Sequence, residues 1–275
     1  MAMVSFLFNL CFFFFLLNLN GFFLFIFFIR TQKLIAECEL TSPEVVCLDL
    51  CCGEGSTAIY IAERYGGRVT GIDIVSGAIK TANEFAKQRG IDNKVTFVEG
   101  NIFKLPFADA SFDVVYGQDP DGLSHPERVH AMREVYRVLK PGGLFSFHHH
   151  WIGGFGFSEA ESNRLGEAAD RLNADFYVSD VQDAGFRIKV AAPIYELADS
   201  HIIKNYQLKK EKGKDIDSWL QARVDSIGAG HKYGVQITAV KPLHGQESSS
   251  RNTLLAFVAG GVLGAILVST LFSKN

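Results

Sequence analysis

The stretch VVCLDLCCGEG, residues 45–55, decides the fold of this 275-residue chain. Its apolar first half, Val45 to Leu50, predicts a short buried strand, and its two glycines predict a tight turn. A helical pattern follows at Ser56 to Tyr65, and a second apolar run, Arg68 to Ile72, ends at Asp73. Strand, glycine turn, helix, strand and acidic residue, in this order, are typical of a nucleotide-binding site in a parallel sheet.

Strand and helix patterns continue to alternate through the central region. Pro141 to Gly143 is expected to turn the chain into a fifth strand. The other elements are helices at Ser76–Arg89, Pro126–Leu139 and Ser179–Ala184, and strands at Val95–Glu99, Phe112–Tyr116, Leu144–His149, Phe186–Ala192 and Val235–Val240. This alternation predicts the α/β class, with a Rossmann-like sheet of seven mostly parallel strands and helices on both of its faces.

Charged side chains are concentrated in the middle of the chain. The formal net charge is -3 and no long basic run occurs, so we expect no nucleic-acid partner. The change in composition divides the chain into four parts: an apolar N-terminal segment (1–30), a globular domain (31–243), a polar tether (244–253) and an apolar C-terminal segment (254–272).

The two apolar ends are long enough to cross a bilayer. Leu254 to Phe272 has Arg251 before it and Lys274 after it, a pattern that predicts a C-terminal transmembrane helix. The Phe-rich stretch Val4 to Ile29 has three interpretations: a second membrane anchor, a signal peptide, or an artefact of the gene model. It lacks a basic start and a clear cleavage site, and its asparagines need partners in lipid.

The residues around the glycine turn suit a nucleotide with a methionine end. Gly53 and Gly55 allow the backbone to approach a ligand where a Cβ would clash. Asp49 is suited to an amino group such as that of a methionine moiety. Asp73 can accept both ribose hydroxyls, and Ile74 can pack against an adenine face.

The glycine spacing also satisfies the dinucleotide fingerprint, so an NAD-dependent oxidoreductase is a competing hypothesis. Three features argue against it. Asp49 stands where a dinucleotide fold normally has an apolar residue, and Asn101, after the third strand, can bond an adenine amino group. The third feature is the stretch LPFADASFDVV (105–115) followed by the stretch RVLKPGG (137–143).

The stretches LDLCCGEG (48–55), LPFADASFDVV (105–115) and RVLKPGG (137–143) together resemble class I S-adenosylmethionine-dependent methyltransferases with a type 11 domain. The nearest look-alikes are sarcosine- and dimethylglycine-type small-molecule N-methyltransferases. The resemblance covers most of Val45 to Val240 and implies an antiparallel last strand and S-adenosylmethionine as cofactor. Cys51 stands at the family's usual first glycine, and Asn101 at its usual aspartate. The implied cofactor-binding residues are Asp49, Cys51, Gly53, Gly55, Asp73, Ile74, Asn101, Ile102 and Gln118.

Candidates for the acceptor side follow the fourth strand. Residues 116–121, YGQDPD, resemble the SQDA stretch of those N-methyltransferases, in which a histidine follows soon after. His125 is the nearest match, displaced by two residues, and is the candidate general base. Strand alternation sends His148 and His149 to opposite faces, so no metal site is expected there.

The resemblance implies methyl transfer from S-adenosylmethionine to a small-molecule or lipophilic acceptor at a membrane surface. A catalytically weak, membrane-tethered S-adenosylmethionine-binding module is the alternative, motivated by Cys51. The expected partners are the methyl acceptor, small molecule or lipid, and the membrane. We expect a membrane-anchored protein with its domain facing the cytosol, where S-adenosylmethionine is made. Arg30 and Lys33, on the domain side of the first apolar segment, agree with this orientation.

Overall fold

A computed structural model describes residues 31–32, 34–38, 40, 42–118, 123–153, 174–193, 203–204, 206–216, 221, 224–225, 227–228 and 233–243. The apolar segments 1–30 and 254–272 and the tether 244–253 lie outside these ranges, so both membrane segments stay predictions. Within the ranges given, no helix is long and apolar enough to cross a bilayer.

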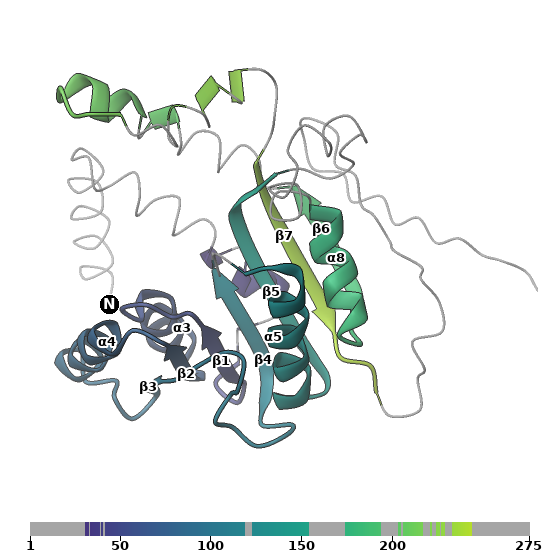
Figure 1. Ribbon diagram of the computed structural model, residues 1–275. Coiled ribbons are helices and arrows are strands. Elements are labelled where there is room, and N and C mark those ends of the chain that lie inside the picture. Colours follow the sequence, from purple (N-terminus) through teal and green to yellow (C-terminus); the bar gives the residue numbers. More distant parts are fainter. Residues whose placement is uncertain are drawn as a thin grey trace, which may run out of the picture.

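Seven strands form one sheet with the order β3-β2-β1-β4-β5-β7-β6 (Figure 1). All pairings are parallel except those of β7, which runs antiparallel to β5 and β6. The predicted mostly parallel sheet with an antiparallel last strand is therefore confirmed. The strands are β1 (Val46–Leu50), β2 (Arg68–Asp73), β3 (Val95–Glu99), β4 (Phe112–Gln118), β5 (Leu139–Gly153), β6 (Arg187–Pro193) and β7 (Tyr233–Val240).

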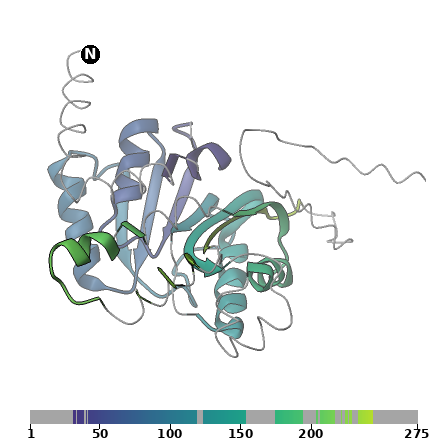
Figure 2. The same cartoon turned by 90° about the horizontal axis from the view of Figure 1, so that it is seen from above.

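Helices cover both faces of the sheet, as predicted (Figures 1 and 2). On one face, α3 (Ser56–Tyr65) and α4 (Ser76–Gln88) bury apolar side chains against β1, β2 and β3. On the other, α5 (His125–Val138) and α8 (Ala174–Asp183) pack over β4, β5 and β7. The two core clusters lie on opposite sides because neighbouring strand residues point to opposite faces.

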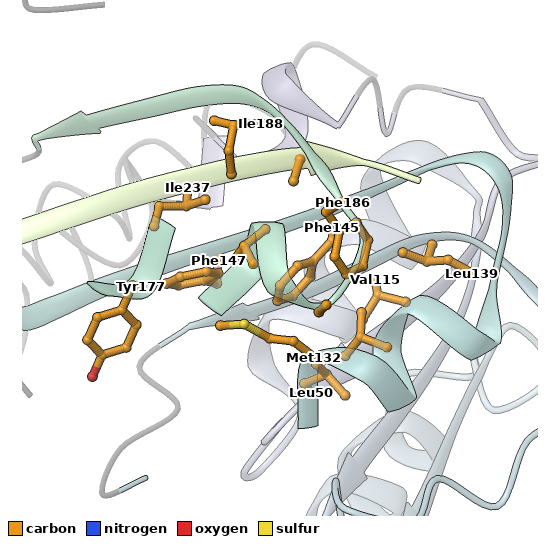
Figure 3. Close-up of a cluster of buried hydrophobic side chains, with 14 of the residues drawn as sticks. Leu50, Val115, Met132, Leu139, Phe145, Phe147, Tyr177, Phe186, Ile188 and Ile237 are labelled. Carbon is orange, nitrogen blue, oxygen red and sulfur yellow. The ribbon is translucent and has the colours of Figure 1, made fainter. Parts of the chain in front are cut away.

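The core under α5 and α8 is rich in aromatic side chains (Figure 3). Phe145 and Phe147 project from β5 toward this side, and Phe186 packs against Phe145 with ring centroids 5.5 Å apart. Tyr177 extends from α8 beside Phe147. This packing fixes the position of α8 relative to α5.

Two elements, α8 and β5, differ from the prediction by more than two residues at a boundary. Helix α8 begins at Ala174 instead of Ser179, because Ala174, Tyr177 and Val178 are all buried and extend its apolar stripe by more than a turn. Strand β5 begins at Leu139, so residues 141–143 lie inside it. There the β4–β5 register shifts and Gly142 takes a φ of 80°. The expected turn is thus an irregularity within the strand.

Residues 31–40 add to the α3 side of the molecule. Residues 31–32 and 34–37 are helical, and Leu34, Ile35, Cys38 and Leu40 are buried in the same cluster as α3 and α4. Apolar burial of this kind stabilises the fold by about 1.5–3 kcal/mol for a large side chain. The described residues before β1 are therefore part of the domain core.

Candidate functional site

The predicted cofactor residues meet at the carboxyl ends of four neighbouring strands. Strand β1 lies between β2 and β4, so the strand order reverses there, and Asp49 pairs with Gly71 on one side and Tyr116 on the other. Open α/β sheets bind ligands outside the carboxyl ends of their strands at such a switch point. The sheet order therefore puts the candidate site beside the turn at residues 51–55.

Three residues of this turn adopt left-handed backbone conformations. The φ angles are 54° at Cys51, 52° at Gly53 and 78° at Gly55. Glycine adopts this region without a steric penalty, whereas a residue with a Cβ is strained there by about 1–3 kcal/mol. The departure noticed at Cys51 therefore has a structural cost.

The two glycines serve different purposes. A Cβ on Gly53 would meet no atom within 4 Å, so this backbone faces open space, as expected for a ligand contact. A Cβ on Gly55 would lie 2.5 Å from Cε1 of Phe97 and 3.1 Å from Cβ of Ala82. The missing side chain of Gly55 therefore makes room for Phe97, a packing role that was not predicted from the sequence, and the predicted ligand contact at Gly55 stays a prediction.

Asp49 is a buried carboxylate with an oxygen left unsatisfied. Its side chain is 3% exposed, and Oδ2 has no hydrogen-bond partner among the described residues. Burial raises the pKa of Asp49 to about 8, and the nearby charge of Asp73 contributes to the rise. Such a group calls for a cationic or hydrogen-bond-donating ligand.

Asp73 connects the end of β2 to the turn. Its Oδ2 accepts the Gly53 N–H and its Oδ1 accepts the Val75 N–H, each at 2.9 Å. Each carboxylate oxygen has two lone pairs, so both keep one for a further donor such as a ribose hydroxyl. Ile74, the next residue, is 68% exposed, so its apolar surface is available to an aromatic ring.

The remaining predicted contacts lie after β3 and at the end of β4. Asn101 Oδ1 accepts the Phe103 N–H at 2.8 Å. Ile102 borders an apolar pocket that also includes Cys51 and residues of β4, β5, α5 and α8. Gln118 Nε2 donates to Thr31 Oγ1 at 3.2 Å, while its buried Oε1 has no partner among the described residues.

Two rows of polar side chains cross the sheet face that carries Asp49. The first row is Asp49, Tyr116, Ser146 and Thr238, and the second is Gln118, His148 and Gln236, each in register across neighbouring strands. Glu37 covers them: its Oε2 accepts the Thr238 hydroxyl at 3.2 Å and lies 3.6 Å from His148 Nε2. Sequence reasoning missed these rows. The signal was present, because β5 and β7 carry polar residues at every second position, which indicates one polar face of the sheet.

His125, the candidate base, is the first residue of α5 and lies on the opposite side of the sheet from Asp49. Its Nδ1 lies 2.5 Å from Oδ1 of Asp180, whose Oδ2 accepts Arg128 Nε at 2.5 Å. The sequence analysis missed both partners. The signal for Asp180 was its place in the apolar stripe of α8, between Tyr177 and Val181.

The described residues hold no group of histidine, cysteine and acidic side chains arranged to bind a metal ion. His148 lies beside Glu37, whereas the ring of His149 lies 6.1 Å from that of Tyr177, so these two histidines face opposite sides as predicted. Burial raises the pKa values of the Cys47 and Cys52 thiols. Thiols of this kind stay protonated and pack as small apolar residues.

These features fit S-adenosylmethionine at the carboxyl ends of β1 and β2. Asp49 has an unsatisfied oxygen suited to an amino group, and Asp73 has acceptors for ribose. The exposed Ile74 offers an adenine contact, and Gly53 leaves space where a side chain would stand.

The curated relatives that this chain matches in sequence include several methyltransferases. Residues 47–143 match the family model described as "Methyltransferase domain". The chain is 35% identical over 146 residues to a glycine/sarcosine/dimethylglycine N-methyltransferase of Actinopolyspora halophila, an overlap of 53% of this chain and 25% of that one. The overlaps cover 25, 32 and 56% of the first three curated relatives, so the chain spans about half of their length or less.

Solved structures agree on the fold. The crystal structure of a protein described as a sarcosine dimethylglycine methyltransferase from Galdieria sulphuraria superposes with a TM-score of 0.64 at 20% identity, covering 78% of this chain and 84% of that one. The [4+2]-cyclase SpnF superposes equally well, with a TM-score of 0.64, 22% identity, and coverage of 78% and 81%. The sheet order, the site and the matched residues 47–143 together support a class I S-adenosylmethionine-dependent methyltransferase domain with S-adenosylmethionine as its cofactor.

Proposed function

We propose that this chain transfers the methyl group of S-adenosylmethionine to a small-molecule acceptor. The observation that carries the proposal is the unsatisfied Oδ2 of Asp49 in a 3% exposed side chain. A buried carboxyl group with an unsatisfied oxygen is costly to ionise unless a ligand supplies a donor or a positive charge. The amino group of S-adenosylmethionine supplies both.

When bound, S-adenosylmethionine supplies an electrophilic methyl group on a sulfonium. Because the methyl is already activated, the chain's task is to hold the reactants close and aligned. Asp49 and Gln118 would hold the amino group, and Asp73 the ribose. The adenine contacts would come from Ile74, Asn101 and Ile102, with Cys51, Gly53 and Gly55 shaping the turn.

His125 is the proposed general base. It follows the carboxyl end of β4 and its side chain is 52% exposed, so an acceptor can reach it. An acceptor that arrives protonated must lose a proton before it attacks the methyl group. His125 would take that proton, whereas an acceptor that arrives neutral would need no base.

The membrane part of the proposal rests on composition. Leu254 to Phe272 would anchor the chain in a membrane, with the domain facing the cytosol. Val4 to Ile29 would be a second anchor if it also spans the membrane. Such a position would bring the site to lipophilic acceptors.

The test is transfer of labelled methyl from S-adenosylmethionine into fractionated polar and lipid extracts, with glycine, sarcosine and dimethylglycine tested individually. Asp73→Ala should weaken S-adenosylmethionine binding by about 1–3 kcal/mol, and the exposed Asp92→Asn is the matched control. Calorimetry with NAD tests the oxidoreductase alternative. Cofactor binding without transfer into any fraction would support the binding-module alternative instead.

A further inference from the structure

The two oxygens of Asp180 contact two different side chains of α5. Oδ1 lies 2.5 Å from His125 Nδ1, and Oδ2 accepts Arg128 Nε at 2.5 Å. Asp180 and Arg128 are nearly inaccessible, with side chains 1% and 2% exposed, whereas His125 is 52% exposed. The three residues thus form a hydrogen-bonded network that runs from the buried α5–α8 interface to the surface.

The buried end of this network is held rigidly. Arg128 Nη1 donates to the Leu123 carbonyl at 3.2 Å, and its guanidinium lies 4.2 Å from the centre of the Tyr177 ring. A buried guanidinium and a buried carboxylate must stay paired, because separating them leaves an uncompensated charge. Asp180 therefore cannot turn away from Arg128, and its Oδ1 stays directed at His125.

This contact determines which nitrogen of His125 carries the proton. A carboxylate accepts hydrogen bonds, so neutral His125 must be protonated on Nδ1 to bond with Oδ1. Free imidazole side chains in water prefer the proton on Nε2. Fixing it on Nδ1 leaves Nε2, on the side of the ring away from Asp180, with a lone pair able to accept a proton.

We propose that Asp180 is a positioning residue, held by Arg128, that fixes His125 in the tautomer needed for a general base. The inference rests on the proposed methyl transfer. In that step the acceptor N–H or O–H proton passes to His125 Nε2, and the acceptor's freed electron pair forms the bond to the methyl carbon. The carbon–sulfur bond breaks with its electrons going to sulfur, which gives S-adenosylhomocysteine, the methylated acceptor and protonated His125.

Nitrogen-15 NMR of the full-length protein labelled at histidine tests the tautomer directly. The His125 signals are assigned by their loss in His125→Gln. We expect wild-type neutral His125 to carry its proton on Nδ1, and Asp180→Asn, whose amide can donate to Nδ1, to move the proton to Nε2. A wild-type imidazole protonated on Nε2 overturns the proposal, even if Asp180→Asn fails to fold.

Turnover separates a positioning role from a merely structural one. With the acceptor fraction that the wild type methylates, Asp180→Asn should lower kcat about 100-fold while leaving the KM for S-adenosylmethionine unchanged. Asp183→Asn, an exposed change on the same helix, should leave both constants unchanged. A change of tautomer without a loss of kcat would refute the positioning role. If the wild type transfers no methyl group into any fraction, the proposed function is refuted instead. The NMR measurement of the His125 tautomer does not depend on that outcome.

Discussion

Replacing Asp49 by asparagine should stabilise the ligand-free protein at neutral pH and weaken its binding of S-adenosylmethionine. The carboxyl is 3% exposed, lacks a partner for Oδ2 among the described residues, and has a pKa of about 8 against the ordinary value of 3.8. The folded protein therefore keeps this proton over a pH range in which the unfolded chain has lost it.

The sign and size of the effect follow from that difference. Between about pH 4 and pH 8 the folded state binds more protons than the unfolded state, so Asp49 lowers the free energy of unfolding as pH rises through this range. Above the pKa of Asp49 in the folded protein, the free energy of unfolding no longer falls because of this group. One proton corresponds to about 1.4 kcal/mol per pH unit, so Asp49 should cost the protein about 2–3 kcal/mol between pH 5 and pH 7. Asparagine does not titrate, so the variant should escape this cost.

Urea unfolding at pH 5 and pH 7 measures the effect. The stability of Asp49→Asn relative to wild type should rise by about 2–3 kcal/mol between the two pH values, and Asp92→Asn removes a charge at an exposed position as the control. An equal difference at both pH values would refute the argument. Calorimetry in two buffers of different ionisation heat adds a second check. Wild type should release up to ~0.9 proton from Asp49 on binding S-adenosylmethionine at pH 7, and the variant none from this residue.

Three further outcomes are expected. Cys51→Gly should raise the free energy of unfolding by about 0.5–2 kcal/mol, because relief of the left-handed backbone strain outweighs the added freedom of glycine in the unfolded chain. Cys52→Gly is the control and should lower the free energy of unfolding. Urea unfolding that finds Cys52→Gly more stable than Cys51→Gly would contradict this prediction. Gly55→Ala should lower the free energy of unfolding by about 2–4 kcal/mol, because the new Cβ clashes with Phe97. Gly90 also has a left-handed backbone, but a Cβ there would meet no atom within 4 Å, so Gly90→Ala should lower the free energy of unfolding by only about 1 kcal/mol. Deleting residues 252–275 should release the protein into the soluble fraction of fractionated cells if this tail is the sole anchor, and retention would implicate Val4 to Ile29.

The sequence predicted the elements whose boundaries have strong local signals. Helix α3 was predicted with its observed bounds, because Gly55 precedes it and Gly66, with a φ of 81°, ends it. The start of α8 was missed because the burial of Ala174 and Tyr177 becomes evident only from the packing on α5 and β5.

The sequence predicted that the candidate cofactor residues lie close together, and it did not predict the contact between His125 and Asp180. Asp49, Gly53 and Asp73 lie within 25 residues of one another, around one strand–turn–helix–strand unit, so their spacing alone brings them together. His125 and Asp180 are 55 residues apart on separate helices. Their contact depends on how α8 lies against α5, which no local pattern specifies.

Phe97 has a consequence for how this sequence can change. Its ring occupies the space that a side chain would need at both Gly55 and Gly71, where a Cβ would approach Phe97 atoms to 2.5 Å. Three positions on three separate elements therefore vary as a set: neither glycine tolerates a larger residue while the phenylalanine is present. Loss of the ring would leave a cavity unless a glycine is replaced at the same time. In a mutational library the pairs 55–97 and 71–97 should accordingly show epistasis. The rescue should be partial, because the left-handed backbone of Gly55 and the Cys52 Sγ atom, 2.8 Å from a Cβ on Gly71, remain.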